Sequence, residues 1–229
     1  MGAAPRLAIM AITLENPRVA TALDRMYTAA NEQLPKLREG GGRIAQAASA
    51  GAQERADAMS EFYIPVTPEA GRLLYSLVRA TRAATIVEFG MSFGISAIHL
   101  ASAVRDNGSG RVVTTELSAT KVAAAQQTFA ETGLDDLITV LEGDALETLK
   151  ELDGPVDFVL LDGWKELYLP VIKLLEPRLS PGSLVVADNT EMADTQPYLD
   201  HVRNPGNGYV SVNFHARESD SMEISCRAG

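Results

Sequence analysis

Three side chains with oxygen donors each follow an apolar segment whose composition is typical of a buried parallel strand. Asp162 comes directly after residues 158–161, and Asp188 and Asn189 follow residues 183–187. Because the carboxyl ends of neighbouring parallel strands open onto one crevice, we expect these three side chains to converge. Carboxylate and amide oxygens are hard ligands that suit Mg²⁺, Mn²⁺ or Ca²⁺ better than a soft metal. The sequence therefore predicts a divalent-cation site at this edge of the sheet.

Lys165 lies three residues after Asp162 and is expected to stand beside the cation. In its neutral form a lysine at that place can remove a proton from a bound substrate, which makes it the predicted general base. Each residue has a structural alternative, because a single aspartate after a strand more often caps a turn and a lysine in a first helical turn is often solvated. The combination of two acids, an amide and a lysine favours the chemical interpretation.

A second group of residues predicts a ligand pocket beside the cation. Glu88-Phe89-Gly90-Met91-Ser92-Phe93-Gly94 follows a predicted strand and opens a helix, so a ligand can approach the backbone and an anionic group is favoured. Its G-x-x-x-G spacing differs from the dinucleotide fingerprint, which argues against a pyrophosphate. Glu116 ends the next strand, where an acid can accept hydrogen bonds from ribose hydroxyls, and Gly143-Asp144-Ala145 forms a turn that could flank an adenine. S-adenosylmethionine, a nucleoside with a carboxylate in place of a diphosphate, fits all three features.

Alternating strands and helices must position these residues. Five strands are predicted at Thr85–Phe89, Arg111–Thr115, Leu137–Leu141, Phe158–Leu161 and Ser183–Ala187. The helices between them are predicted at Phe93–Val104, Ala119–Glu131, Leu146–Leu152 and Lys165–Leu179, the last followed by a turn at Pro181-Gly182. After a short helix at Thr195–Val202, two strands at Tyr209–His215 and Met222–Arg227 predict a hairpin at the sheet edge. This order predicts an α/β fold with a Rossmann-like, doubly wound parallel sheet.

The N-terminal 60 residues are predicted to form a helical extension of a domain that spans residues 61–229. Apolar residues on one face predict a helix over Asn16–Leu37, and a second helical stretch is expected over Ala45–Ser60. The apolar face of the first helix is formed by Val19, Leu23, Met26, Tyr27 and Leu34. These helices are expected to cover the sheet; covering the crevice or forming a homodimer contact remains an alternative. Thr67 is the predicted N-cap of a further helix, Pro68–Arg82.

The composition restricts the partners of the protein. A net charge of −10 over 229 residues argues against a nucleic-acid partner, which would require a basic face. The single cysteine, Cys226, excludes an intrachain disulfide and a cysteine-based zinc cluster. Leu7–Leu14 is not followed by a signal-peptidase-like site, and no apolar run is long enough to span a bilayer, so we expect a cytoplasmic protein without a membrane partner.

From about Val66 onward the sequence resembles the class I S-adenosylmethionine-dependent O-methyltransferases, in particular the metal-dependent catechol O-methyltransferase group. The segments that carry the resemblance are VEFGMSFGISA, TTELS, FVLLDGWKELYLP, VVADN and YLDHVR, of which DGWKELYLP and ADN are the most specific. The resemblance implies a seven-stranded sheet whose last strand is antiparallel. It also implies the transfer of a methyl group from S-adenosylmethionine to a hydroxyl of a small aromatic diol.

The resemblance assigns a role to each predicted site residue. It implies that Mg²⁺ is bound by Asp162, Asp188 and Asn189, and that Lys165 is the general base. It further implies that Glu116 binds the ribose and that Trp164 flanks the adenine. The remaining predicted cofactor contacts are Val66 and Ser96 at the methionyl end, Glu88 and Gly90 in the loop, the turn Gly143, Asp144 and Ala145, and Asp162.

The sequence departs from the animal catechol enzymes at three places. Gly163 stands where a histidine is expected after the first metal-binding aspartate, and Ala145 stands in place of a serine. The segment Phe214–Ser221 between the last two strands is short, and Glu218 is the one candidate there for an acid that contacts the acceptor. These differences bear on the identity of the substrate more than on the type of reaction.

Two other functions are compatible with the same sheet. A nicotinamide-dependent oxidoreductase is disfavoured by the missing third glycine and by the absence of a Tyr-x-x-x-Lys pair. A non-catalytic, methyltransferase-like binding module would need neither the acids nor Lys165. The sequence therefore favours an Mg²⁺-dependent O-methyltransferase.

Overall fold

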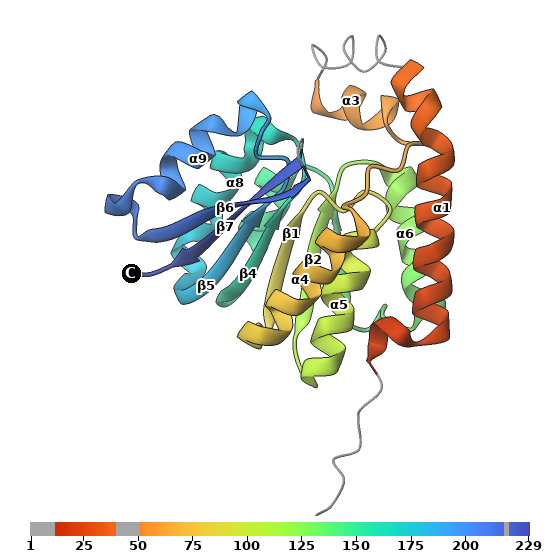
Figure 1. Ribbon diagram of the computed structural model, residues 1–229, viewed down its shortest axis with the longest axis horizontal. Coiled ribbons are helices and arrows are strands. Elements are labelled where there is room, and N and C mark those ends of the chain that lie inside the picture. The colour runs from red at the N-terminus through yellow and green to blue at the C-terminus, as the bar shows by residue number, and fades with distance from the viewer. Residues whose placement is uncertain (1–11, 40–50, 218–219) are drawn as a thin grey trace, which may run out of the picture.

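The computed structural model describes residues 12–39, 51–217 and 220–229, which form a seven-stranded mixed sheet with helices on both faces (Figure 1). The strand order is β3-β2-β1-β4-β5-β7-β6. The strands are β1 (Thr85–Phe89), β2 (Arg111–Glu116), β3 (Ile138–Glu142), β4 (Val156–Leu161), β5 (Leu179–Ala187), β6 (Tyr209–Arg217) and β7 (Asp220–Arg227). Strand β7 runs antiparallel to both β5 and β6, whereas β1 to β5 pair in parallel. The predicted sheet, with its last strand antiparallel, is confirmed.

Side chains that alternate along the central strands build two separate cores. Ile86 of β1 and Leu160 of β4 face one core, while their neighbours Val87 and Leu161 face the other. The first core is covered by α1 (Pro17–Glu39), α4 (Pro68–Thr81), α5 (Ile95–Asn107) and α6 (Ala119–Thr132). The second is covered by α7 (Ala145–Thr148), α8 (Tyr168–Leu175) and α9 (Gln196–Arg203). Strands buried on both faces explain the continuous apolar runs in the sequence.

The N-terminal helix α1 packs against α6, as Figure 1 shows. Val19, Leu23 and Met26 are buried in the first core, as predicted. Leu34 is 43% exposed, so its predicted place on the buried face is wrong. The following helix, α3, spans Ala52–Ala58, and the predicted stretch before residue 51 lies outside the described residues.

Most predicted elements agree with the structure to within a few residues, and the clearest difference is at the start of β5. The predicted turn at Pro181-Gly182 lies inside β5, which begins at Leu179. The pairing moves from Val156 opposite Leu179 to Phe158 opposite Leu184, so the extra residues form an irregular bulge. None of the described helices is long and apolar enough to cross a membrane.

Candidate active site

A cavity of about 430 Å³ lies at the carboxyl ends of the parallel strands. Loops that follow β1, β2, β3, β4 and β5 all contribute to its wall, which is the expected location of a ligand site in a doubly wound sheet. The predicted site residues that line it are Gly90, Glu116, Gly143, Asp144, Ala145, Asp162, Trp164, Lys165 and Asn189. Residues from both predicted groups therefore share one cavity.

Four predicted residues lie elsewhere. Val66 and Glu88 are buried and are not among the residues that line the cavity, and the same holds for Asp188, which is 5% exposed. Ser96 lines a small neighbouring hollow of about 10 Å³ together with Asp162. The predicted cofactor contacts of Val66 and Glu88 stay predictions, and Glu218 lies outside the described residues.

The predicted metal ligands lie at the ends of adjacent parallel strands. The Asp162 amide donates to Phe89 O at 2.8 Å and the Asp188 amide donates to Leu161 O at 2.9 Å, so each aspartate is the first residue beyond its strand. Asn189 has a φ of 53°, a left-handed conformation that asparagine tolerates better than most residues and that is often found at functional sites.

Two carboxylates and one amide are a donor set that fits a hard divalent cation. A cluster of three or more His, Cys, Asp or Glu side chains suited to a metal is not found among the described residues. A site here would therefore combine two acids with the amide oxygen of Asn189 and with oxygen atoms from water or substrate.

Lys165 is held at the edge of the cavity by two polar partners. Its Nζ lies 3.3 Å from Asp162 Oδ1 and 2.7 Å from the Tyr168 hydroxyl, which in turn donates to Asp188 O at 3.1 Å. Burial, and then the negative charges of Asp162 and Asp188, raise the pKa of Tyr168 well above its usual value. Tyr168 thus stays a neutral hydrogen-bonding group that links the lysine to the end of β5.

Glu116 organises the loop on the cofactor side of the cavity. Its Oε2 accepts a hydrogen bond from Ser92 N at 2.8 Å, and its Oε1 accepts from Leu117 N and Ser118 N at 2.9 Å each. Ser92 has a φ of 50°, so the carboxylate stabilises a loop conformation that is otherwise unfavourable. Glu116 joins the end of β2 to the loop after β1, at the place predicted for the ribose.

Glu88 is fully buried in β1, beneath the cavity. The Thr114 hydroxyl donates to its Oε2, while Oε1 has no hydrogen-bond partner within the described part of the chain. Burial raises the pKa of Glu88 to about 7, and the hydroxyls of Ser96 and Thr114 oppose this shift only in part. The carboxyl can therefore exchange a proton near neutral pH.

The sequence of this chain is similar to that of known methyltransferases. A family model described as a methyltransferase domain matches residues 87–190. Catechol O-methyltransferase B of Danio rerio is 31% identical over 181 residues, which cover 74% of this chain and 67% of that protein. Catechol O-methyltransferase of Sus scrofa is 33% identical over 143 residues, which cover 59% of this chain and 76% of that protein. This chain belongs to the catechol O-methyltransferase-like family of class I S-adenosylmethionine-dependent O-methyltransferases.

Solved structures agree with this assignment at the level of the fold. The O-methyltransferase from Bacillus cereus in complex with SAH has a TM-score of 0.68 and 20% identity, with 90% of each chain covered. The prediction of an S-adenosylmethionine-dependent O-methyltransferase is confirmed by the family membership. The oxidoreductase and the non-catalytic module are accordingly set aside.

The structure explains why this O-methyltransferase has Gly163 where its family resemblance predicts a histidine. A Cβ atom at Gly163 would lie 2.5 Å from the Phe89 ring, and one at Gly90 would lie 2.5 Å from Gly163 N. Gly90 has a φ of 97°, which also favours glycine. The loops after β1 and β4 therefore pack backbone against backbone beside the buried Phe89, and no side chain fits at position 163.

Several cavity residues of this O-methyltransferase were not predicted from the sequence. Ala52, Arg55, Ala56 and Met59 bring α3 to the cavity wall. Arg55 lies with its guanidinium carbon 4.4 Å from the centre of the Trp164 ring, and its Nη2 lies 2.6 Å from Glu166 Oε1. No local sequence signal marks this contact, because it joins segments about 110 residues apart.

Lys121 of α6 was also missed, although its position carried a signal. Its Nζ donates to Ser92 Oγ at 3.2 Å in the cavity wall, and burial lowers its pKa. The Ser118 side chain caps the N-terminus of α6, so Lys121 places a cation in the first turn, where the helix dipole disfavours it. A lysine at such a place indicates that another interaction holds it.

Proposed function

We propose that this enzyme transfers a methyl group from S-adenosylmethionine to one hydroxyl of a catechol-like aromatic molecule, in a reaction that depends on Mg²⁺. The observation that carries the proposal is the position of Asp162, Asp188 and Asn189 at the ends of β4 and β5, with Lys165 Nζ 3.3 Å from Asp162 Oδ1. The relatives that are 31% and 33% identical are catechol O-methyltransferases, which supports the same acceptor class.

Asp162, Asp188 and Asn189 would hold the cation, and Mn²⁺ or Ca²⁺ would use the same donors. A bound divalent cation supplies positive charge that favours the deprotonated form of a nearby phenolic hydroxyl, whose pKa is otherwise about 10, judged by tyrosine. Two adjacent hydroxyls on one ring offer a pair of oxygen donors at a fixed separation, whereas separated hydroxyls do not. A vicinal diol is therefore the favoured acceptor.

Lys165 would take the proton from the reacting hydroxyl. Its Nζ is fixed between Asp162 and Tyr168, so no large movement of the side chain is needed to reach an acceptor in the cavity. The oxygen then attacks the methyl carbon, the carbon–sulfur bond breaks, and its electrons remain on sulfur. The products are an aromatic methyl ether, S-adenosylhomocysteine and one proton.

The cavity wall suits a small aromatic acceptor. Apolar side chains form much of the wall around the polar group of acids and lysine, as is typical of small-molecule sites. They include Met59, Ile64, Trp164, Leu167 and Met192. We propose that the enzyme acts on a small molecule and not on a nucleic acid or a membrane, because its net charge of −10 would repel both. A homodimer and a cytoplasmic location stay predictions.

The test uses labelled S-adenosylmethionine with catechol and with resorcinol, which has the same two hydroxyls in non-adjacent positions. We expect methylation of catechol with Mg²⁺, loss of turnover in EDTA, recovery when Mg²⁺ is added in excess, and little methylation of resorcinol. Turnover that is insensitive to EDTA would remove the role given to the acids. Equal rates on both diols would remove the requirement for adjacent hydroxyls.

A further inference from the structure

The loop after β5 is anchored at Thr190, directly after Asn189. Thr190 is 6% exposed, and each of its polar groups is bonded. Its amide donates to Ser221 O at 3.0 Å, and its carbonyl accepts from Thr195 Oγ1 at 3.1 Å. Its hydroxyl lies 2.8 Å from Ser221 Oγ and accepts from Asn213 Nδ2 at 3.0 Å. One residue thus connects the predicted metal-binding loop to β6, to β7 and to the start of α9.

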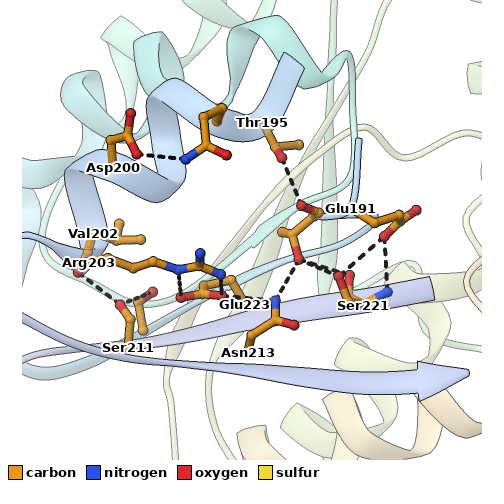
Figure 2. Close-up of polar contacts among 12 residues, drawn as sticks. Glu191, Thr195, Asp200, Val202, Arg203, Ser211, Asn213, Ser221 and Glu223 are labelled. Atoms are coloured by element: carbon orange, nitrogen blue, oxygen red, sulfur yellow. Dashed lines mark hydrogen bonds and ion pairs between the residues drawn. The ribbon is translucent and has the colours of Figure 1, made fainter. Parts of the chain in front are cut away.

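A chain of polar contacts continues outward from Thr190, and Figure 2 shows its members around Asn213 and Glu223. Asn213 Nδ2 also donates to Glu223 Oε2 at 3.0 Å. Glu223 accepts from Arg203 Nε at 2.8 Å and from Arg203 Nη2 at 2.6 Å, and its side chain is only 1% exposed. A buried carboxylate held by a two-point arginine contact is directional, so it fixes the orientation of Asn213.

A second contact fastens the same loop from the other side. Glu191 Oε2 accepts from Ser221 N at 3.0 Å and lies 3.3 Å from Ser221 Oγ, as Figure 2 shows. The two residues after Asn189 are therefore both bonded to the start of β7. Asn189 itself has a φ of 53°, a conformation that persists only where neighbouring contacts hold it.

We propose that Thr190, Asn213, Glu223 and Arg203 are positioning residues that hold Asp188 and Asn189 in the arrangement that binds the divalent cation. This inference rests on the proposed Mg²⁺ site. None of the four lines the cavity, so they act through the backbone of the loop rather than by contact with substrate. Loss of the Thr190 hydroxyl would let the loop relax and would weaken metal binding more than binding of S-adenosylhomocysteine, whose predicted contacts lie mainly on β1, β2 and β3.

The experiment measures the Mn²⁺ affinity of the 229-residue chain by electron paramagnetic resonance, with S-adenosylhomocysteine present. Thr190→Val keeps the shape of the side chain but removes its hydroxyl, and we expect about tenfold weaker Mn²⁺ binding, the lower end for residues that support metal ligands. Thr190→Ser keeps the hydroxyl and should stay within about threefold of the parent chain. Glu223→Gln, farther along the network, should give an intermediate loss.

Ser211→Ala is the matched control. Ser211 Oγ bonds to Val202 O at 2.9 Å and to Ser225 Oγ at 2.8 Å, so it ties the same hairpin to α9 without reaching Thr190 (Figure 2). This variant should bind Mn²⁺ like the parent chain. A loss equal to that of Thr190→Val would mean that general docking of the hairpin, and not the network, matters, which overturns the inference.

The remaining outcomes separate the inference from the proposed function. A parent chain that binds no Mn²⁺ refutes the metal site and the inference together. If the parent chain binds Mn²⁺ and both Thr190→Val and Glu223→Gln bind it as tightly as the parent does, the inference alone is refuted. Thermal unfolding and S-adenosylhomocysteine binding check that each variant is folded, and Glu223→Gln provides the decisive comparison if Thr190→Val does not fold.

Discussion

The two halves of the cavity are built in different ways. On the cofactor side, Glu116 binds three backbone amides from nearby loops, so much of the geometry comes from main-chain contacts at the ends of β1 and β2. On the side of the proposed metal site, the Tyr168 side chain of α8 joins Lys165 to the Asp188 carbonyl. Thr190 joins the same loop to Asn213 of β6 and, through Asn213, to Glu223 of β7 and Arg203 of α9. The cofactor half is thus held largely by main-chain hydrogen bonds, whereas the half with the proposed metal site is linked through side chains to α8, α9, β6 and β7.

This difference indicates how the two halves respond to substitution. A substitution in the cofactor half removes hydrogen bonds from a loop and should lower the affinity for the cofactor. A substitution in the half with the proposed metal site displaces reacting groups and should lower kcat. The four predictions below test this division, in order of expected effect.

The largest effect is expected from Lys165→Ala. Loss of the predicted base should lower kcat by about 10²–10³-fold, while S-adenosylhomocysteine binding stays within a few-fold of the parent chain. Steady-state kinetics and isothermal titration calorimetry measure the two quantities. Lys173→Ala, in the helix α8 that follows Lys165, is the control, because Lys173 is half-exposed. A variant at Lys165 that keeps most of its turnover would assign proton removal to another group.

The second effect is a change in the pH dependence of stability at Glu88, on the strand between the two halves. Its pKa in the folded chain is about 7, above the value of 4.5 for an unburied glutamate, so the neutral carboxyl favours folding at low pH. That contribution is complete below pH 4.5 and is lost as the pH rises through 7. Glu88→Gln should remove this loss, on the order of 3 kcal/mol between those limits.

Denaturant unfolding of both proteins at a series of pH values tests this expectation. The titration of other groups cancels in the difference between the two free energies of unfolding. A difference that does not change with pH would mean that Glu88 titrates as an ordinary carboxyl.

A smaller effect is expected from Glu116→Gln in the cofactor half. The neutral glutamine side chain accepts hydrogen bonds less well than the carboxylate does. The backbone N–H groups of Ser92, Leu117 and Ser118 therefore hold the loop less firmly. Affinity for S-adenosylhomocysteine should fall about tenfold, with kcat at saturating cofactor nearly unchanged. Glu142→Gln is the matched control, because Glu142 pairs with Glu116 in the sheet register and is exposed. A fall in kcat with unchanged affinity for S-adenosylhomocysteine would contradict the division between the two halves.

The smallest effect is expected at Arg55, which lies over Trp164 and pairs with Glu166. Arg55→Met should raise the dissociation rate of S-adenosylhomocysteine about threefold, because a cation over an aromatic ring contributes modestly. Trp164 is the only tryptophan, so stopped-flow fluorescence reports on this site directly. Glu54→Gln, on the exposed side of α3, serves as the control. An unchanged rate would show that α3 does not retain the cofactor.

Much of the fold could be predicted because it rests on local patterns. The bounds of β1 were predicted to the residue, and Thr67 caps α4 with its side chain accepting from Ala70 N, as expected. Parallel strands place their carboxyl ends together, so the adjacency of Asp162 and Asp188 followed from topology. The predictions failed where burial and pairing depend on distant segments, as at Leu34, which is 43% exposed, and at Pro181-Gly182, which lies in a bulge of β5.

The sequence alone determined which chemical groups are available and which loops meet, because residue type sets the chemistry and the alternation of strands and helices sets the topology. Only the tertiary structure decided the details around the cavity: that Val66 and Glu88 are buried, that Arg55 from α3 reaches Trp164, and that a side chain at Gly163 would collide with the Phe89 ring. The physical reason is packing. Close contacts between segments far apart in the chain depend on how whole elements fit together, and no local pattern encodes that fit.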